Sequence, residues 1–194
     1  MAIAGYNKLI ILDRDGVMNA VHNHEPITDP DDWTALPGSM DAIAFLTQAD
    51  YTVVVAENMS GIGRGKISMQ QLNEVHAKMH MQIKKTGGHI SGVWFCPHTA
   101  AADCSCRKPR AGMVLDILDR LHMKAENTWL VGDSLRDLQA IESVGGHPAL
   151  VLTGKGKQTL AQEALPEDTQ VFDDLLAFAK YRIEQDSPDD EKEA

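Results

Sequence analysis

Short runs of consecutive apolar residues alternate along the chain with longer segments in which apolar positions recur every three or four residues. A continuous apolar run predicts a strand buried on both faces, as in a parallel sheet, whereas the longer spacing predicts an amphipathic helix. The runs that predict strands lie at residues 8–12, 51–56, 90–95, 128–131 and 149–152.

Helical spacing fills the segments between these strands. The first helix is predicted to begin at Ser39, which we expect to cap it, and Ser68 with Gln71 has the pattern of a capping box for a helix that runs towards Lys85. Further helices are predicted over residues 113–121, 135–143 and about 173–183.

The alternation of strand and helix predicts an α/β fold with a Rossmann-like parallel sheet and helices on both faces. We expect one domain over residues 1–185 and a disordered acidic tail over residues 186–194, because the last residues are too polar to pack. Ligands of such sheets bind beyond the carboxyl ends of the strands, so candidate chemistry is sought there.

Composition and charge narrow the class of partner. The chain has 194 residues, of which 43% are apolar and 24% charged, as expected for one globular domain. Its formal net charge of -10 and its lack of a basic patch argue against nucleic acid or a membrane as partner. No stretch approaches the roughly 18 apolar residues of a membrane span or the core of a signal peptide. We therefore expect a cytoplasmic monomer that acts on a small molecule.

Aspartates follow two of the predicted strands. Asp13 and Asp15 come directly after the first strand, and Asp133 and Asp137 follow the fourth. Since the carboxyl ends of parallel strands share one edge, these acids should form a crevice, and carboxylate oxygens suit Mg²⁺. A single Asp-x-Asp is most often a solvated loop. Here, however, a second acidic motif and Lys108, which could neutralise a phosphoryl group and keep a carboxylate ionised, favour a site.

Three cysteines and a histidine crowd into one short stretch. They are Cys96, His98, Cys104 and Cys106. Two ligands on each side of a short loop match a closed tetrahedral zinc site, which leaves no position open for water and is therefore structural. The alternative is three reduced cysteines without metal. A bound Zn²⁺ would pin the loop that presents Arg107 and Lys108.

These motifs together resemble the haloacid dehalogenase-like (HAD) superfamily of aspartyl phosphatases, in its small form without a large cap domain. The residues that carry the resemblance are Asp13-x-Asp15-Gly16, Asn58-x-Ser60-Gly61, Lys108 and Gly132-Asp133-x-x-x-Asp137. Within that superfamily the segments 12–16, 60–65 and 106–109 and the Cys-Pro-His loop resemble the D-glycero-D-manno-heptose 1,7-bisphosphate 7-phosphatases of lipopolysaccharide-precursor synthesis. Histidinol-phosphate phosphatases share the metal loop and remain the alternative. We favour the heptose branch because its members typically carry Ser-Gly-Ile-x-Arg-Gly after the second strand.

The resemblance implies a Mg²⁺-dependent phosphatase that acts on a sugar phosphate through an aspartyl-phosphate intermediate. Asp13 would be the nucleophile, and Asp15 would serve first as general acid and then as general base. Mg²⁺ would be held by Asp13, the backbone carbonyl of Asp15 and Asp133, with Lys108 as a second positive charge. The substrate-binding residues that the resemblance implies are Asn19, His22, His24, Asn58, Ser60, Arg107 and Lys108. For His22 and His24 the alternative is an ordinary place in a loop.

Position 57 departs from the pattern of the superfamily. Members of the superfamily carry a Thr or Ser at this position, and its hydroxyl hydrogen-bonds the transferred phosphoryl group, whereas this chain has Glu57. Two residues later, Met59 stands where the heptose branch has a side chain with an amide. A carboxylate in an acidic pocket should weaken phosphate binding, because two like charges at about 4 Å repel by ~1 kcal/mol in water and ~4 kcal/mol at an effective dielectric near 20. We therefore place Glu57 in the catalytic pocket and expect Glu57→Thr to raise activity. One alternative is a shifted loop in which Ser60 or a backbone amide takes over. Another is a catalytically impaired relative that binds a phosphorylated sugar or a protein partner.

Two further patterns carry less weight. His76 and His80 stand one helical turn apart, but Ala77 occupies the place of the glutamate in a zinc-protease helix, so we expect an exposed helix face. The segment 154–157 lacks the residues of a nucleotide-binding loop, and its lysines could instead contact an anionic substrate.

Overall fold

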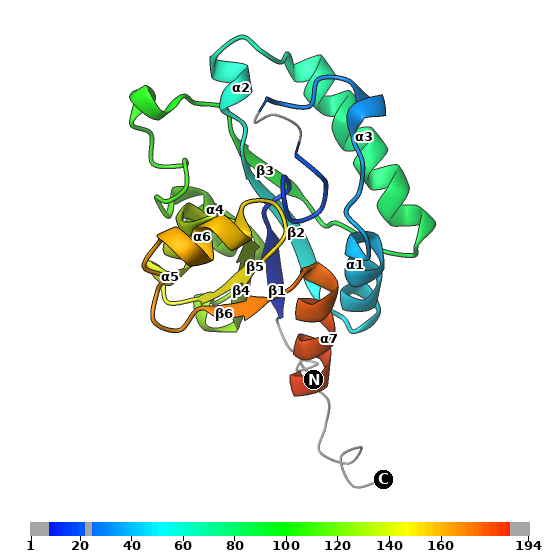
Figure 1. Ribbon diagram of the computed structural model, residues 1–194, viewed down its shortest axis with the longest axis vertical. Coiled ribbons are helices and arrows are strands. Elements are labelled where there is room, and N and C mark those ends of the chain that lie inside the picture. The colour runs from blue at the N-terminus through cyan, green and yellow to red at the C-terminus, as the bar shows by residue number, and fades with distance from the viewer. Residues whose placement is uncertain (1–7, 22–24, 187–194) are drawn as a thin grey trace, which may run out of the picture.

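A six-stranded sheet forms the centre of the protein, with the strand order β3-β2-β1-β4-β5-β6 and every neighbouring pair parallel (Figure 1). This computed structural model describes residues 8–21 and 25–186. The strands are β1 (Leu9–Leu12), β2 (Thr52–Asn58), β3 (Val93–Cys96), β4 (Thr128–Gly132), β5 (His147–Val151) and β6 (Gln170–Phe172). The predicted parallel α/β fold is confirmed.

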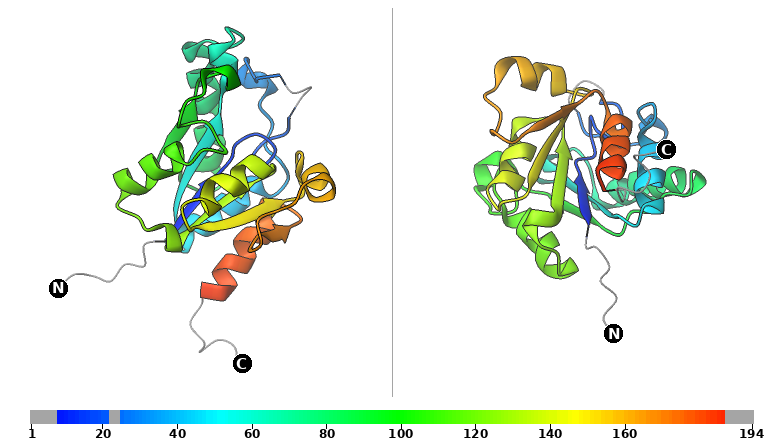
Figure 2. Two further views of the ribbon diagram at one scale, coloured as in Figure 1. Left: turned by 90° about the vertical axis from the view of Figure 1, so that its left-hand side faces the viewer. Right: turned by 90° about the horizontal axis from the view of Figure 1, so that it is seen from below.

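Helices cover both faces of the sheet (Figure 2). The helices are α1 (Ser39–Gln48), α2 (Ser60–Gly63), α3 (Met69–Lys85), α4 (Gly112–Leu121), α5 (Leu135–Glu142), α6 (Gly156–Gln162) and α7 (Leu175–Asp186). Residues of α1, α3 and α7 pack on one face, and residues of α4 and α5 pack on the other. Short 3₁₀ turns lie at Pro30–Asp32, Ala100–Ala102 and Ala125–Asn127.

Strand β1 shows why the apolar runs are continuous. All four of its side chains are fully buried. Ile10 and Leu12 belong to the core that faces α1, α3 and α7, whereas Leu9 and Ile11 belong to the core that faces α4 and α5. A strand covered on both sides needs apolar residues at every position.

The two predicted helix caps have different outcomes. Ser68 and Gln71 form the expected capping box at the start of α3. The expected capping role of Ser39 is wrong, because α1 already begins at this residue, after Gly38 in the left-handed conformation with φ 74°. The Ser39 hydroxyl instead donates to the carbonyl oxygens of Met18 and Leu36, which ties the start of α1 to the loop after β1.

Several boundaries differ from the predicted ones. Strand β2 continues to Asn58, β3 begins only at Val93, and neither α6 nor β6 was predicted. Helix α7 includes Asp186, which was assigned to the tail; its carboxylate pairs with Lys8 and Arg182, so the last turn is anchored to the domain. Residues 187–194 lie outside the described part. No helix of the described part is long and apolar enough to cross a membrane.

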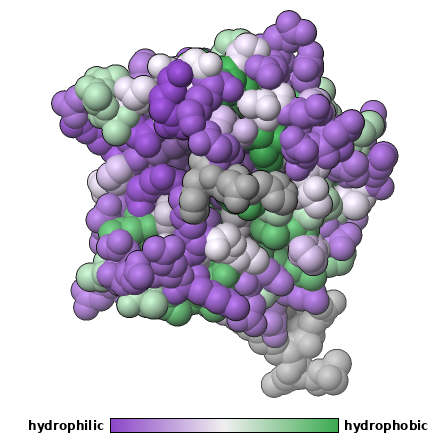
Figure 3. All heavy atoms as spheres, turned by 45° about the horizontal axis from the view of Figure 1, so that its top comes forward, coloured by the Kyte–Doolittle hydropathy of each residue, from purple (hydrophilic) through white to green (hydrophobic). Residues whose placement is uncertain are grey.

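The carboxyl ends of the strands point towards the top of Figure 1. When this end is turned towards the viewer, hydrophilic residues dominate the surface (Figure 3). A polar surface at this edge of a parallel sheet is where a ligand site is expected.

Candidate active site

Three aspartates converge at the carboxyl ends of neighbouring strands. Asp13 follows β1, Asp133 follows β4, and Asp137 lies in the first turn of α5. All three are buried, and one carboxylate oxygen from each lies within 4.8 Å of the others. The direct pairing of β1 with β4 brings together acids that are more than a hundred positions apart in the sequence.

A buried lysine contacts two of these three carboxylates. Lys108 Nζ donates to Asp13 Oδ1 at 3.0 Å and to the Ala56 carbonyl oxygen at 2.6 Å, and it lies 2.7 Å from Asp137 Oδ1. Burial opposes the charge of this lysine, but Asp13 and Asp137 more than offset that effect and raise its pKa. Asn58 holds the Lys108 backbone through two hydrogen bonds of 2.9 and 3.1 Å.

The acidic cluster carries more negative than positive charge. Burial, followed by the neighbouring Asp137, raises the pKa of Asp13 to about 7, although Lys108 opposes the shift. Burial and Asp137 likewise raise the pKa of Asp133 to about 6. A site in which adjacent carboxylates resist ionisation is stabilised by a cation, and its hard oxygen donors match Mg²⁺. The residues therefore fit the predicted magnesium site.

Two glycines let the surrounding loops approach Asp133. A Cβ atom at Gly16, where φ is 85°, would lie 2.1 Å from Asp133 Oδ2, and one at Gly154, where φ is 55°, would lie 2.3 Å from the same oxygen. The backbone N–H of Lys155 donates to this oxygen at 2.9 Å. The loop after β5 thus closes one side of the site, and any larger residue at either glycine would displace Asp133.

Asp15 lines the cavity, and one oxygen of its carboxylate is hydrogen-bonded to two residues that do not line it. Its Oδ1 accepts from Arg14 Nε at 2.9 Å and from Asn19 Nδ2 at 3.1 Å. Burial opposes ionisation, but Arg14, Asn19 and Arg136 together outweigh it, so the pKa of Asp15 is lowered. Asn19 is fully buried and also donates to the Ala20 carbonyl oxygen, so its expected place in the sugar site is wrong. It supports the Asp15 carboxylate instead.

Glu57 does not lie in the catalytic pocket, where it was predicted to lie. Its Oε1 is 2.7 Å from His76 Nε2 and its Oε2 is 3.1 Å from Arg14 Nε. Because β2 continues to Asn58, Glu57 shares the face of Val53 and Val55 and is not among the described residues that line the cavity. The placement of Glu57 in the catalytic pocket is therefore wrong, and the expected repulsion of phosphate and the expected gain of activity in Glu57→Thr lose their basis.

The two histidines of α3 also differ from each other. His80 is exposed, as predicted, whereas the side chain of His76 is only 12% exposed and contacts Glu57. Sequence reasoning missed this contact because helical spacing places both histidines near the same side of α3. Their positions along the helix decide which of them meets β2.

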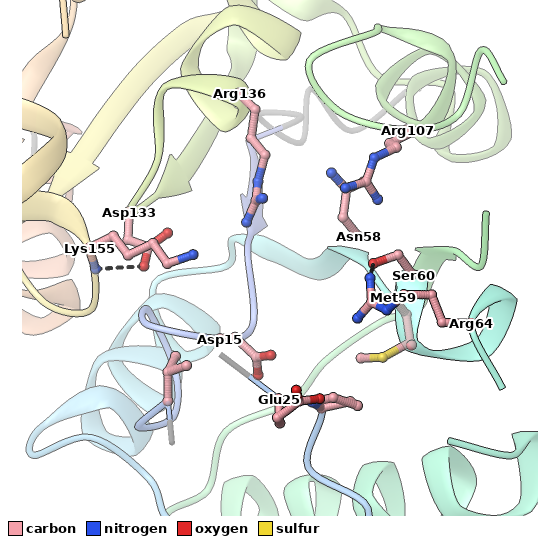
Figure 4. A pocket seen from close by; sticks show the side chains of 13 residues that line it. Asp15, Glu25, Asn58, Met59, Ser60, Arg64, Arg107, Asp133, Arg136 and Lys155 are labelled. Carbon is pink, nitrogen blue, oxygen red and sulfur yellow. Dashed lines mark hydrogen bonds between the residues drawn. The ribbon is translucent and has the colours of Figure 1, made fainter. Parts of the chain in front are cut away.

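A cavity of about 260 Å³ opens above the aspartates (Figure 4). Asp15 and Asp133 line it, and four cationic side chains point towards it: Arg64, Arg107, Arg136 and Lys155. Arg107 and the loop of Lys155 were predicted to contact substrate, whereas Arg64 and Arg136 were not singled out. Signals for both existed, since Arg64 belongs to the Ser-Gly-Ile-x-Arg-Gly segment and Arg136 precedes Asp137. The balance of acids and cations suits a phosphate ester with a bound metal ion.

Some of the other residues that were predicted to bind substrate line the cavity, and others do not. Asn58 and Ser60 line the cavity, and the Ser60 hydroxyl accepts a hydrogen bond from Arg64 at 2.6 Å. Lys108 lies beneath the cavity, against Asp13. His22 and His24 lie outside the described residues.

The cysteine and histidine cluster has the geometry of a metal site. The three sulfur atoms of Cys96, Cys104 and Cys106 lie 3.3–3.5 Å apart, and His98 Nδ1 is 3.3 Å from Cys106 Sγ and 3.6 Å from Cys96 Sγ. A tetrahedral zinc ion with bonds of about 2.3 Å would separate sulfur ligands by about 3.8 Å. Four donors this close, without a disulfide, fit Zn²⁺.

Comparison with known proteins places the chain among phosphatases. A HAD-hydrolase-like family model matches residues 105–178. The D-glycero-beta-D-manno-heptose-1,7-bisphosphate 7-phosphatase of Neisseria meningitidis serogroup A is 59% identical over 182 residues, which cover 93% of this chain and 97% of that protein. The enzyme of the same name from Bordetella bronchiseptica is 49% identical over 178 residues, covering 92% and 99%.

Solved structures agree with these relatives. The D,D-heptose 1.7-bisphosphate phosphatase from B. bronchiseptica, crystallised with magnesium and phosphate, superimposes with a TM-score of 0.89 over 92% of this chain and 99% of that chain, at 49% identity. The corresponding phosphatase from Burkholderia thailandensis gives a TM-score of 0.74 at 48% identity, covering 91% and 98%.

Proposed function

Because this chain belongs to the family of D-glycero-beta-D-manno-heptose-1,7-bisphosphate 7-phosphatases, we propose that it hydrolyses the 7-phosphate of that heptose bisphosphate. It is a phosphoric monoester hydrolase of the HAD type. The observation that carries the proposal is the contact between Lys108 and Asp13, whose carboxylate lies within 4.8 Å of that of Asp133, a residue that lines the cavity together with four cations. A nucleophilic carboxylate, a metal site and a receptor for phosphate thus occupy one place.

Asp13 attacks the phosphorus atom in line, the bond from phosphorus to the sugar oxygen breaks, and an aspartyl-phosphate forms. Asp15 donates a proton to the departing sugar oxygen. It then removes a proton from the water that attacks the phosphoryl group, which releases inorganic phosphate and restores Asp13. Lys108 neutralises part of the charge on Asp13 and on the phosphoryl oxygens.

The two metals have different roles. The carboxylates of Asp13 and Asp133 and the backbone carbonyl of Asp15 would hold Mg²⁺, which supplies positive charge to the phosphoryl oxygens. Cys96, His98, Cys104 and Cys106 would hold Zn²⁺, and its role would be structural because four protein ligands leave no position open for water. Bound there, it would fix the start of the segment that carries Arg107 and Lys108.

The cations around the cavity bind the anionic substrate. Arg136 and Lys155 lie on the side of Asp133, and Arg64 and Arg107 lie on the opposite side (Figure 4). Guanidinium groups bind phosphate through paired hydrogen bonds, so two sets of cations suit a substrate with two phosphates. The net charge of -10 and the three cysteines outside any disulfide support a cytoplasmic protein without a nucleic-acid or membrane partner. We propose that it acts as a monomer.

A Mg²⁺-dependent phosphate-release assay tests this function. It compares heptose 1,7-bisphosphate, histidinol phosphate and p-nitrophenyl phosphate, with Asp13→Asn as the inactive control. We expect the highest kcat/KM for heptose bisphosphate and loss of the 7-phosphate by NMR. A preference for histidinol phosphate would assign the chain to the alternative activity, and the absence of any hydrolysis would refute catalysis.

A further inference from the structure

A line of buried polar contacts connects helix α3 to the general acid. His76 Nε2 lies 2.7 Å from Glu57 Oε1, Glu57 Oε2 lies 3.1 Å from Arg14 Nε, and Arg14 Nε donates to Asp15 Oδ1 at 2.9 Å. The four side chains come from α3, β2 and the loop after β1. They connect a residue at the edge of the domain to the residue that protonates the leaving group.

Arg14 depends on the two carboxylates at its Nε atom. The residue is completely buried, and neither of its terminal nitrogens has a hydrogen-bond partner among the described residues. The orientation of the guanidinium is therefore set by the contacts of Nε with Asp15 and Glu57. Without Glu57, this buried cation would lose its second carboxylate and would be free to turn.

His76 in turn determines how Glu57 is oriented. Its side chain is 12% exposed, its ring is tilted against Phe95 with centroids 6.5 Å apart, and it belongs to a 17-residue helix with a complete capping box. A rigid His76 holds Glu57 Oε1. The other oxygen, Oε2, is thereby directed to Arg14.

Asp15 is the residue through which these contacts affect the cavity. Its Oδ1 is occupied by Arg14 and Asn19, whereas no hydrogen bond from a described residue engages Oδ2. Proton transfer to the sugar oxygen requires Oδ2 to lie within hydrogen-bond distance of it, and small misplacements of a catalytic group are costly. The orientation of Arg14 thus decides where Oδ2 points.

We propose that Glu57 and His76 are positioning residues for this phosphatase: together they orient Arg14, which holds the Asp15 carboxylate in place to protonate the leaving group. The proposal rests on the proposed function and concerns one step of it. It gives a role to the residue that replaces the usual Thr or Ser, and to a histidine outside the cavity.

The test compares two leaving groups. A sugar alkoxide needs a proton as it departs, whereas p-nitrophenolate leaves with little help from an acid. Because kcat/KM reports steps up to the first irreversible one, we expect His76→Ala to lower kcat/KM roughly tenfold for the sugar phosphate and less than about twofold for p-nitrophenyl phosphate. His76→Gln, whose amide can donate to Glu57, should restore most of the loss.

Two controls separate positioning from damage to the fold. His80→Ala removes an exposed histidine one turn further along α3 and should leave both kcat/KM values unchanged. In a Glu57→Gln background, His76→Ala should have little additional effect on the ratio of the two kcat/KM values, because the two residues act through one contact. Thermal unfolding confirms that each variant is folded.

Two results would overturn the proposal: an unchanged ratio of the two kcat/KM values in folded His76→Ala, whether or not both values fall, or full additivity with Glu57→Gln. If the wild-type protein prefers another sugar phosphate, the substrate assignment fails, but the same comparison made with that ester still tests the positioning role. A wild-type protein with no phosphatase activity refutes both.

Discussion

Magnesium binding should release protons, and the number released should depend on pH. Asp13 and Asp133 have pKa values raised to about 7 and about 6, chiefly by burial and by the neighbouring Asp137. Mg²⁺ binds carboxylates, so any proton on these groups must leave when the ion enters. From the two pKa values, the metal-free site carries about one proton at pH 6.5 and about a tenth of a proton at pH 8.

The same pKa values give the direction of the stability change. A carboxyl group whose pKa is higher in the folded than in the unfolded state stabilises the fold while it is protonated, and this stability is lost as pH rises through the folded value. For Asp13 and Asp133 together, the free energy of unfolding of the magnesium-free protein should fall by on the order of 3 kcal/mol between pH 5.5 and 8. Mg²⁺ at a hundredfold excess over its Kd should restore about 2.7 kcal/mol at pH 8.

Isothermal titration calorimetry in buffers with different ionisation enthalpies measures the proton release directly. The zinc site is kept loaded, so only magnesium varies. Asp133→Asn removes one ligand and should weaken Mg²⁺ binding, whereas Asp41→Asn, at an exposed position of α1, should change neither affinity nor proton release. Equal proton release at pH 6.5 and 8, or none at pH 6.5, would refute the electrostatic account of the site.

Four further outcomes follow from the contacts. Lys108→Met should lower the free energy of unfolding by about 3 kcal/mol and kcat by at least about a hundredfold, because it leaves two buried carboxylates without their cation; denaturant unfolding and steady-state kinetics measure both. Cys96→Ser should reduce bound zinc well below one equivalent by metal analysis and lower Tm, and a full equivalent in this variant would contradict the ligand set. Arg136→Ala should lower kcat/KM roughly 30-fold, equivalent to about 2 kcal/mol of lost charge-assisted hydrogen bonding, with exposed Lys157→Ala as the unaffected control. Glu57→Thr should lower the free energy of unfolding by about 1–3 kcal/mol, since a buried guanidinium loses a partner, and an unchanged unfolding midpoint would argue against the ion pair.

The position of the catalytic aspartates could be predicted because it depends on local pattern and on general rules of parallel sheets. The apolar run before Asp13 predicts a strand, and the alternation of elements brings the end of this strand beside the end of the strand before Asp133. The zinc ligands could be predicted equally well, because all four lie within eleven consecutive residues and no long-range contact is needed to recognise them.

The cations of the cavity were harder to predict. Arg64 and Arg136 enter it from two elements that follow different strands, and although each lies in or beside a recognisable motif, the motif does not say which way the side chain points. Asn19 shows the reverse case, since a loop residue assigned to the sugar site is buried behind Asp15.

Sequence by itself therefore determined the order of elements, the parallel sheet, the carboxylates at its edge and the clustered zinc ligands, because each of these depends on neighbours in the chain or on the geometry of strands in general. Only the tertiary structure decided the orientation of Glu57. Two more residues in β2 placed this side chain on the face that packs against α3, where Arg14 and His76 meet it. The direction of a side chain at a strand end depends on where the strand stops and on which charges from distant segments are buried with it, and packing of the whole domain sets both.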